Sequence, residues 1–416
     1  MFGVLRTAVE KFGYEEYDAP ILEPLDLYLA KTGEEIVNEQ TYTFEDRGGR
    51  KVAIRPEMTP TVSRMVAAKR QELPYPVRWY SIPNLWRYER PQRGRLREHW
   101  QLNVDLFGLA GIEAEHEMIL VIDSIMQAFH AKRHMYGIKL NSRKFTDYVL
   151  HNYIGLDDVQ AYSVAKLIDR MHKMDQTQFM VQLDALCTPS QRDEGVVEKL
   201  LEVLSAKRSS ALPAALQGHA SLGQIQFLID LLAESGVTNV EFDITLMRGF
   251  DYYTDIVFEV FDTHPDNNRS MMGGGRYDGL VGLFGVEPVP TIGFGFGDVT
   301  LQNFLQLHEL QPKLHPETNL YVILVGDVFK QAQKPIADLR AAGLRVAIDT
   351  TGRKIGAQIQ TAEKKGIHYV MFIGEREIAD EQYMIKNLQT GVEEKHGLSR
   401  LISIVDDYRH VDEDDL

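Results

Sequence analysis

The N-terminal part of the chain shows two kinds of apolar spacing, one typical of helices and one typical of strands. Apolar residues recur every three to four positions over 4–12 and 113–136, so we expect helices there. Residues 41–58 instead alternate between polar and apolar on either side of Gly48 and Gly49. This alternation around a glycine turn predicts a β-hairpin.

A further helix is expected over residues 59–73, with Thr59 as its N-cap and Pro60 as its first residue. Residues 77–89 and 97–108 alternate again, and a basic loop lies between them. We interpret these two runs as antiparallel strands joined by that loop.

The texture of the chain changes over residues 144–236, where amphipathic helical pieces follow one another with few strand signals. A strand over 136–142 precedes this stretch, and strands over 239–247, 255–262 and 291–297 follow it. We therefore expect a helical insertion within a domain that is otherwise built on a sheet.

The last part of the chain reads β-α-β-α-β, which is typical of a parallel α/β domain. We expect an α+β domain with an antiparallel sheet over 1–143 and 237–310, and a helical insertion over 144–236. A polar linker would cover 311–318, and the α/β domain would cover 319–416.

Composition narrows the class of protein. The 416 residues carry 45 Lys and Arg against 60 Asp and Glu, a net charge of −15, with 44% hydrophobic and 25% charged residues. These values are ordinary for a soluble enzyme and exclude fibrous, disordered and membrane classes. Cys187 is the one cysteine, so we expect no intrachain disulfide and a cytoplasmic location.

The positive charge is concentrated within eleven residues, at Arg87, Arg90, Arg93, Arg95 and Arg97. A solvated charged edge would explain such a cluster. However, Arg87 and Glu89 alternate on one expected strand, and Gln101, Asn103 and Asp105 alternate on the next. A period of two places each set on one face of the sheet, which favours a polar pocket over a core.

Two further segments combine glycine with aromatic or basic residues. In Leu246–Tyr253, Arg248 and two tyrosines on a glycine-kinked strand could form an anion and aromatic pocket, or simply pack. The glycines of Met272–Gly279 would let a backbone approach a ligand closely, although a turn explains them equally well. Gly293–Gly297 alternates Gly with Phe, which suggests a strand whose bare face lies against a planar ligand.

Taken together, residues 41–60, 85–108, 247–259 and 273–280 resemble histidyl-tRNA synthetases, a family of class II aminoacyl-tRNA synthetases. Residues 352–366, GRKIGAQIQTAEKKG, resemble the anticodon-binding domain of that family. The resemblance implies activation of L-histidine with ATP and Mg²⁺, followed by transfer of histidine to the 3′ end of its tRNA. It also implies a homodimer formed around Pro20, and no membrane partner.

The resemblance assigns roles on the histidine side of the site. Glu57 and Thr59 would hold the α-amino group, Gln101 and Asp105 would line the pocket, and Tyr252 and Tyr253 would enclose the imidazole. On the ATP side, Arg87 would bridge the substrate carboxylate and the α-phosphate, Glu89 would contact adenine or Mg²⁺, and Arg95 would contact the triphosphate. Arg248 would stabilise charge on the α-phosphate and also contact histidine. For tRNA, the implied contacts are Arg90, Gln92 and Arg93 at the acceptor end and Arg353 and Lys354 at the anticodon.

The chain departs from the family pattern at Thr300, where class II enzymes usually carry an arginine. This departure leaves an alternative open, because the regulatory subunit of ATP phosphoribosyltransferase resembles the same fold and binds histidine without charging tRNA. Three features favour the synthetase. They are the presence of Arg248, the domain over 319–416, and the strongly basic loop after Glu89.

Overall fold

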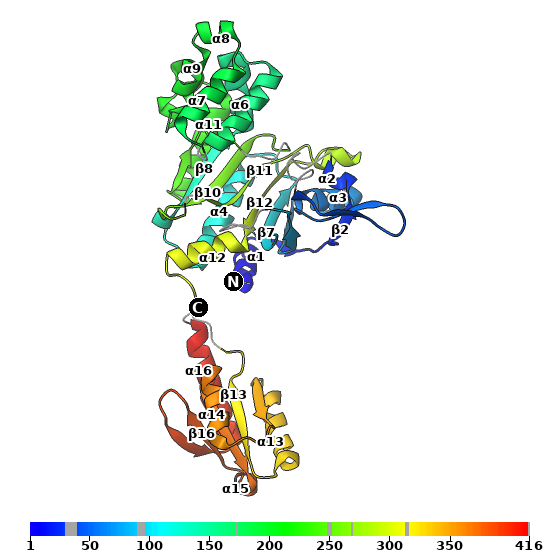
Figure 1. Ribbon diagram of the computed structural model, residues 1–416, viewed down its shortest axis with the longest axis vertical. Coiled ribbons are helices and arrows are strands. Elements are labelled where there is room, and N and C mark those ends of the chain that lie inside the picture. The colour runs from blue at the N-terminus through cyan, green and yellow to red at the C-terminus, as the bar shows by residue number, and fades with distance from the viewer. Residues whose placement is uncertain are drawn as a thin grey trace. The chain divides into compact units, whose positions relative to one another are not determined.

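The computed structural model describes residues 1–29, 40–89, 96–171, 174–247, 252–267, 269–312 and 316–414. These residues form two compact units, Met1–Gln311 and Pro312–Leu416, and each is described here by itself (Figure 1). No helix among the described residues is long and apolar enough to cross a membrane.

The first unit is built on a nine-stranded sheet among its described residues. The strands are β1 Glu15–Glu16, β5 Val77–Ser81, β6 Asn84–Trp86, β7 Glu98–Phe107, β8 Tyr136–Ser142, β9 Val240–Phe242, β10 Ile256–Asp262, β11 Ser270–Arg276 and β12 Thr291–Gly297. The order is β1-β5-β7-β12-β11-β10-β8-β9, with β6 paired to β7. The pairs from β5 to β8 are antiparallel, and β1 and β9 are parallel to their neighbours.

One face of this sheet is covered by helices α1 Phe2–Glu10, α4 Glu113–Ala128 and α12 Asp298–Leu307 (Figure 1). Leu102 and Val104 of β7 are buried with Ile119 of α4 in the main hydrophobic cluster. Residues that alternate with them along β7 therefore point to the opposite face. That face carries Gln101 and Asp105.

A small sheet and two helices lie beside the large sheet in the same unit. The small sheet has the order β2-β4-β3, and its elements are β2 Leu22–Pro24, β3 Thr43–Glu45, β4 Lys51–Ile54, α2 Asp26–Leu29 and α3 Thr59–Lys69. The predicted hairpin is confirmed, with Gly49 N–H donating to the carbonyl of Asp46. The predicted cap of α3 is wrong by one residue, because Met58 is the N-cap and Thr59 is the first helical residue.

Helices follow one another after β8 and gather beyond the end of that strand (Figure 1). They are α5 Arg143–Tyr148, η3 Val149–Ile154, α6 Asp158–Arg170, α7 Gln176–Leu186, α8 Pro189–Asp193, α9 Val196–Leu204, α10 Ala214–Gln217 and α11 Ala220–Glu234. Side chains of Asp157, Asp175 and Thr188 accept hydrogen bonds from backbone N–H groups at three of the helix starts. Short polar caps thus divide this segment into separate helices.

Several local predictions are wrong. The helix expected over 113–136 ends at Ala128, because His130 adopts a positive φ of 60° and a short 3₁₀ turn η2, Arg133–Met135, leads into β8. The strand expected through Glu89 ends at Trp86. Gly273, Gly274 and Gly275 lie in strand β11, between β10 and β12, whereas Gly279 lies in the turn that follows the strand. Tyr252 lies in a turn, and neither Tyr252 nor Tyr253 is on a strand.

The second unit confirms the predicted β-α-β-α-β order. Its elements are β13 Leu320–Val325, α13 Phe329–Ala341, β14 Val346–Asp349, α14 Ile355–Lys364, β15 Tyr369–Gly374, α15 Glu375–Asp380, β16 Tyr383–Asn387, β17 Glu393–His396 and α16 Leu398–Asp414. Strands β13, β14 and β15 are parallel. The two antiparallel strands β16 and β17, which we did not predict, extend the sheet to the order β14-β13-β15-β16-β17.

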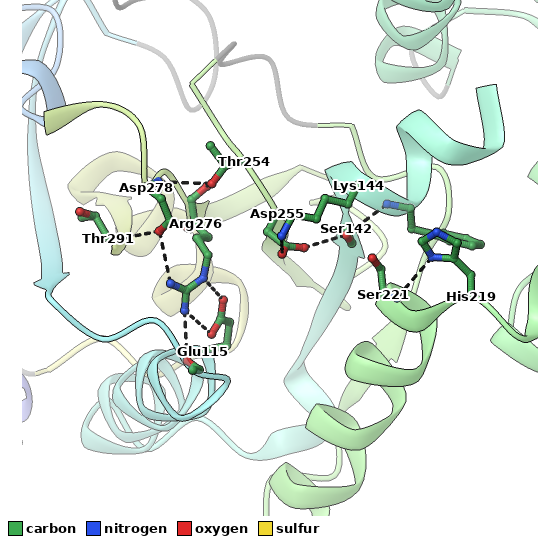
Figure 2. Close-up of polar contacts among 12 residues, drawn as sticks. Glu115, Ser142, Lys144, His219, Ser221, Thr254, Asp255, Arg276, Asp278 and Thr291 are labelled. Atoms are coloured by element: carbon green, nitrogen blue, oxygen red, sulfur yellow. Dashed lines mark hydrogen bonds and ion pairs between the residues drawn. The ribbon is translucent and has the colours of Figure 1, made fainter. Parts of the chain in front are cut away.

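A buried ion pair joins the large sheet to α4. Arg276, at the end of β11, donates to Glu115 through Nε at 2.6 Å and through Nη2 at 2.7 Å, and both residues are nearly fully buried (Figure 2). The guanidinium also donates to the carbonyls of Leu109 and Gly111. With its donors satisfied in this way, the pair fixes the end of β11 against the start of α4.

We expect Arg276→Ala to destabilise the first unit by about 3–5 kcal/mol, because it leaves the Glu115 carboxylate buried without its counter-charge. Chemical denaturation measures the loss. The control is Arg6→Ala, which removes an exposed pair with Glu16 and should cost no more than about 1 kcal/mol. Equal losses in the two variants would contradict the special role of the buried pair.

Candidate functional site

A row of directly paired residues crosses the polar face of the large sheet. From one strand to the next it runs through Trp79, Asp105, Gly293, Gly275, Val257 and Asn141. Paired residues share a face, so two positions without a side chain lie between Asp105 and Val257. Tyrosine side chains lie against these positions, Tyr253 at Gly275 and Tyr277 at Gly293.

The glycines are required by what lies above them. A Cβ atom on Gly293 would collide with Asp105 and come within 2.8 Å of the Tyr277 hydroxyl. A Cβ atom on Gly295 would come within 2.9 Å of the Gln101 side chain. The bare face of β12 is therefore where the polar side chains of β7 lie. The predicted strand is confirmed, and these contacts are the physical reason for its glycines.

Asp105 is the central acidic group of the site. Its side chain is 97% buried, and its Oδ1 accepts a hydrogen bond from the hydroxyl of Tyr277. Its Oδ2 has no hydrogen-bond partner among the described residues. Burial raises the pKa of the Asp105 carboxyl to about 7, against the lowering effect of the Tyr277 hydrogen bond. A buried acceptor without a partner is costly, so this oxygen marks a place for a donor from a ligand.

Three tyrosine rings lie together, and one of them, Tyr277, donates to this carboxylate. The ring of Tyr252 lies 4.9 Å from that of Tyr253 and 5.6 Å from that of Tyr277, centroid to centroid, and the last two are 6.5 Å apart. The Tyr252 hydroxyl donates to Oε2 of Glu57 at 3.2 Å. The structure thus brings together Glu57, Asp105 and the tyrosines, which are far apart in the sequence.

Tyr277 is a site residue that the sequence analysis missed. We interpreted Met272–Gly279 through its glycines alone, and treated the tyrosine as part of the segment. The signal available in the sequence was a Tyr directly after a glycine-rich strand, where the chain leaves the sheet. Its bond to Asp105 joins positions 172 residues apart, so no local pattern reveals it.

Glu57 and Thr59 lie at the start of α3, with Glu57 buried and Thr59 half-buried. The guanidinium of Arg87 reaches the same turn, where its Nε donates to the carbonyl of Pro56 at 2.9 Å. Arg87 follows β6 directly. This contact brings the guanidinium of one predicted motif to the backbone of the residue that precedes Glu57 in the other.

His99 of β7 is paired with Leu85 of β6, two residues before Arg87. Burial, together with the charge of Arg87, lowers the pKa of the His99 imidazole to about 4. This histidine is therefore neutral at physiological pH. Glu89 is half-buried, and its carbonyl accepts a hydrogen bond from Arg97 Nε at 3.3 Å.

Several predicted site residues lie outside the described residues. They are Arg90, Gln92, Arg93, Arg95 and Arg248. The site described here therefore consists of the remaining predicted residues of the first unit, together with Tyr277.

Thr300 lies in the first turn of α12. Its hydroxyl is 2.8 Å from the carbonyl of Gly297 and 2.8 Å from that of Met271. The hydroxyl therefore joins this turn to β11, which gives the residue a local structural role.

In the second unit, Arg353 is tied to its own loop. Its Nη2 donates to Asp349 at 2.5 Å and its Nε donates to the Thr351 hydroxyl at 2.8 Å. Lys354 is exposed and precedes the first residue of α14. The two predicted tRNA contacts therefore differ, because one is an anchored guanidinium and the other is an exposed ammonium.

The described residues contain no group of three or more His, Cys, Asp or Glu side chains that could hold a metal ion. An Mg²⁺ ion that enters with a nucleotide needs fewer protein ligands than that, because it is commonly held by one or two carboxylates and the phosphates. The half-buried carboxylate of Glu89 is compatible with such a role.

Comparison with known proteins agrees with this architecture. The family profile described as histidyl-tRNA synthetase matches residues 1–298, and the profile described as anticodon binding domain matches residues 319–408. A histidine–tRNA ligase of Leptospira biflexa is 43% identical over 391 residues, which cover 93% of this chain and 89% of that protein.

Solved structures share the fold. A histidyl-tRNA synthetase from Nostoc sp. PCC 7120 superposes with a TM-score of 0.79 at 22% identity, covering 98% of this chain and 94% of that one. An ATP phosphoribosyltransferase regulatory subunit/histidyl-tRNA synthetase from Bacillus halodurans superposes with a TM-score of 0.70 at 20% identity, covering 89% and 92%. At this identity both likenesses concern the fold alone.

The profile match spans well over half of the chain, and the Leptospira relative matches nearly all of it. The chain belongs to the histidyl-tRNA synthetase family.

Proposed function

We propose that this chain is a histidine–tRNA ligase, which activates L-histidine with ATP and then transfers it to the 3′ end of its tRNA. The observation that carries the proposal is Oδ2 of Asp105, which has no partner among the described residues and belongs to a side-chain cluster that reaches Glu57 through Tyr277 and Tyr252. Histidine is an amino acid with N–H donors at both ends, an ammonium at one and an imidazole at the other. The two buried carboxylates match this pair of donors.

In this proposal Asp105 accepts an imidazole N–H, while Gln101 lines the pocket and Tyr252 and Tyr253 enclose the ring. Glu57 and Thr59 hold the α-amino group. An amino acid without a ring N–H would leave the buried Asp105 oxygen without a partner, which is how a polar site rejects an isostere.

The ATP side follows from Arg87 and from residues outside the described part of the chain. Arg87 would lie between the histidine carboxylate and the α-phosphate, with Arg248 stabilising the developing charge and also contacting histidine. Glu89 and Arg95 would contact the nucleotide. A carboxylate oxygen of histidine attacks the α-phosphorus, the bond to pyrophosphate breaks, and histidyl-adenylate remains. Positioned cations suit such a displacement, which needs no protein nucleophile.

The family implies the use of ATP. We propose that Mg²⁺ binds together with ATP and that Glu89 is the protein carboxylate that contacts it. When bound through the phosphates, Mg²⁺ would neutralise charge on the leaving pyrophosphate. This chain's own contribution is to orient the nucleotide with Arg87 and the histidine with Glu57.

For tRNA, we propose that Arg90, Gln92 and Arg93 contact the acceptor end, and that Arg353 and Lys354 contact the anticodon. The fixed geometry of Arg353 beside Asp349 suits an arginine that positions the loop, with Lys354 free to approach a phosphate. A few local cations suffice for such contacts despite the net charge of −15.

We further propose a division into a catalytic domain over 1–143 and 237–310, a helical insertion over 144–236, a linker over 311–318 and an anticodon-binding domain over 319–416. The order of elements and the two compact units support this division. A homodimer formed around Pro20 and a cytoplasmic location also belong to the proposal, on the strength of the family and of the composition.

Histidine-dependent exchange between ATP and pyrophosphate tests the proposal on the full chain, with other amino acids as controls. Exchange that occurs with histidine alone would support adenylate formation. It would also show that a chain with Thr300 in place of the usual arginine is active. Histidine binding without exchange would instead favour the regulatory-subunit function, and Thr300→Arg would then be the first variant to examine.

We expect Arg87→Ala to lower the exchange rate by about 10²–10³-fold, the effect of removing one preorganised group that stabilises charge in a transition state. Its circular dichroism spectrum should remain that of the unchanged protein. The control Arg6→Ala, on the exposed face of α1, should retain the rate. A near-normal rate in Arg87→Ala would contradict the role given to this residue.

We expect the stability of the ligand-free protein to decrease as the pH rises from about 4 to about 7. In this range the unfolded Asp105 has lost its proton, whereas the folded one, with a pKa of about 7, still holds it. The folded state therefore binds more protons, and a higher pH favours unfolding. Denaturation curves at several pH values should show this slope, and Asp105→Asn should reduce it. An unchanged slope in the variant would show that other groups cause it.

We expect Lys354→Ala to lower the rate of tRNA charging at limiting tRNA several-fold and to leave ATP–pyrophosphate exchange unchanged, since one phosphate contact is lost. Lys354 is a cleaner choice than Arg353, whose removal would also strip the buried Asp349 of its partner. Lys395→Ala, which removes an exposed pair with Asp380, is the control. A parallel loss of exchange would contradict the division of labour between the units.

A further inference from the structure

The segment that leads to Tyr252 and Tyr253 is fastened at both of its described ends to one short stretch of chain, the end of β8 and the start of α5. This stretch is Lys139–Lys144, here called the β8 clamp. One of its residues, Asn141, lies in the same row of the sheet as Asp105, through the paired positions Val257, Gly275 and Gly293.

At the first end, the buried side chain of Asn141 holds the backbone. Its Nδ2 lies 3.2 Å from the carbonyl of Ile244 and 3.1 Å from that of Leu246, and donates to both. Its Oδ1 accepts from the N–H of Ser142, which keeps the amide in this orientation. Asn141 is 1% exposed, so losing these bonds would leave a buried polar group unsatisfied.

Leu246 connects this end to the pocket. Its side chain is buried in one hydrophobic cluster with Tyr253, Val257, Tyr277 and Leu280. The carbonyl that Asn141 holds and the side chain that packs against the tyrosines thus belong to the same residue. A displacement of the backbone at Leu246 would therefore also displace Tyr253 and Tyr277, the tyrosine bonded to Asp105.

At the second end, Asp255 fastens the chain two residues after Tyr253. The Ser142 hydroxyl donates to its Oδ1 at 2.9 Å and Lys144 Nζ donates to its Oδ2 at 2.5 Å (Figure 2). The N–H of Arg143 donates to its carbonyl at 2.9 Å. Between Tyr253 and Asp255, the N–H of Thr254 donates to the carbonyl of Arg276 at 2.8 Å. The chain next to the tyrosines is thus held from both sides.

We propose that Asn141 and Asp255 are positioning residues for histidine, acting through Leu246, Tyr252 and Tyr253. They touch no substrate in this arrangement, and their effect is on where the tyrosines stand. The proposal rests on the proposed function, because it concerns the imidazole side of that pocket. In this proposal the β8 clamp, which lies where the helical segment after β8 begins, sets the affinity for histidine.

The pair of Asp255 and Lys144 offers a direct test, because only one partner is exposed. The Lys144 side chain is 62% exposed and that of Asp255 is 13% exposed. Lys144→Ala should fold normally, since it changes a surface residue. Asp255→Asn keeps the shape and an acceptor for Ser142 but loses the charge. Lys69→Ala is the matched control, because Lys69 is 61% exposed and pairs with Glu72 at 2.8 Å.

The experiment measures histidine affinity by calorimetry on the full chain without ATP, and then the KM values for histidine and for ATP in exchange. We expect Asp255→Asn to weaken histidine binding about tenfold, within the range by which misplaced groups reduce function. Lys144→Ala should weaken it less, and the KM for ATP should stay within about twofold in both, because the clamp acts on the imidazole side. Asn141→Ala, if it folds, should resemble Asp255→Asn.

The salt dependence of histidine affinity distinguishes a positioning role of the ion pair from a merely structural one. An ion pair with one exposed partner is screened by salt, so histidine affinity in the unchanged protein should fall at high salt. In Lys144→Ala this part of the salt dependence should be absent, whereas Lys69→Ala should behave like the unchanged protein.

The outcomes separate this inference from the proposed function. If the unchanged protein binds no histidine, the proposed function fails and the inference fails with it. If the unchanged protein binds histidine but Asp255→Asn and Lys144→Ala bind it equally well, the inference alone is overturned. A loss that affects histidine and ATP alike, together with a lowered Tm, would also overturn it, because that is the signature of general destabilisation.

Discussion

The site depends on a gap in the sheet, where Gly275 and Gly293 lie side by side between Asp105 and Val257. In a sheet of ordinary residues, Cβ atoms would fill this space. Here the Asp105 carboxylate, the Tyr277 hydroxyl and the Tyr253 ring occupy that space. The cost is a buried acid whose Oδ2 has no partner within the described part of the chain and whose pKa rises to about 7. A ligand that donates to this oxygen would remove that cost.

Parts of the site that depend on local periodicity could be predicted from the sequence. Alternation alone places Gln101 and Asp105 on one face of β7, because successive side chains of a strand point to opposite faces. The hairpin turn at Gly48-Gly49 and the β-α-β-α-β order of the second unit are likewise local patterns. The fold class followed from such elements and from the resemblance of four segments to one family.

Other parts could not be predicted, because they depend on contacts between distant segments. The glycines of β11 form a strand only because β10 and β12 supply hydrogen bonds on both sides, so their sequence alone is equally typical of a turn. Likewise, Arg87 faces Glu57's turn by donating to the Pro56 carbonyl after β6 has ended, and not by alternation along a longer strand. Tyr277 became visible only through its bond to Asp105.

The arrangement of charge explains how an acidic protein can host a reaction between an amino acid and a polyphosphate. In the proposed assignment Asp105 and Glu57 are buried acceptors on the amino-acid side, whereas Arg87, which donates to the Pro56 carbonyl, lies between that side and the nucleotide. Its charge also helps to keep His99 neutral. Opposite charges are thus separated within one pocket, and a substrate that carries an ammonium, an N–H ring and a carboxylate can satisfy both regions at once. A simple phosphate or a simple cation would satisfy only one of them, which is the reason why we propose a site for histidine together with a nucleotide.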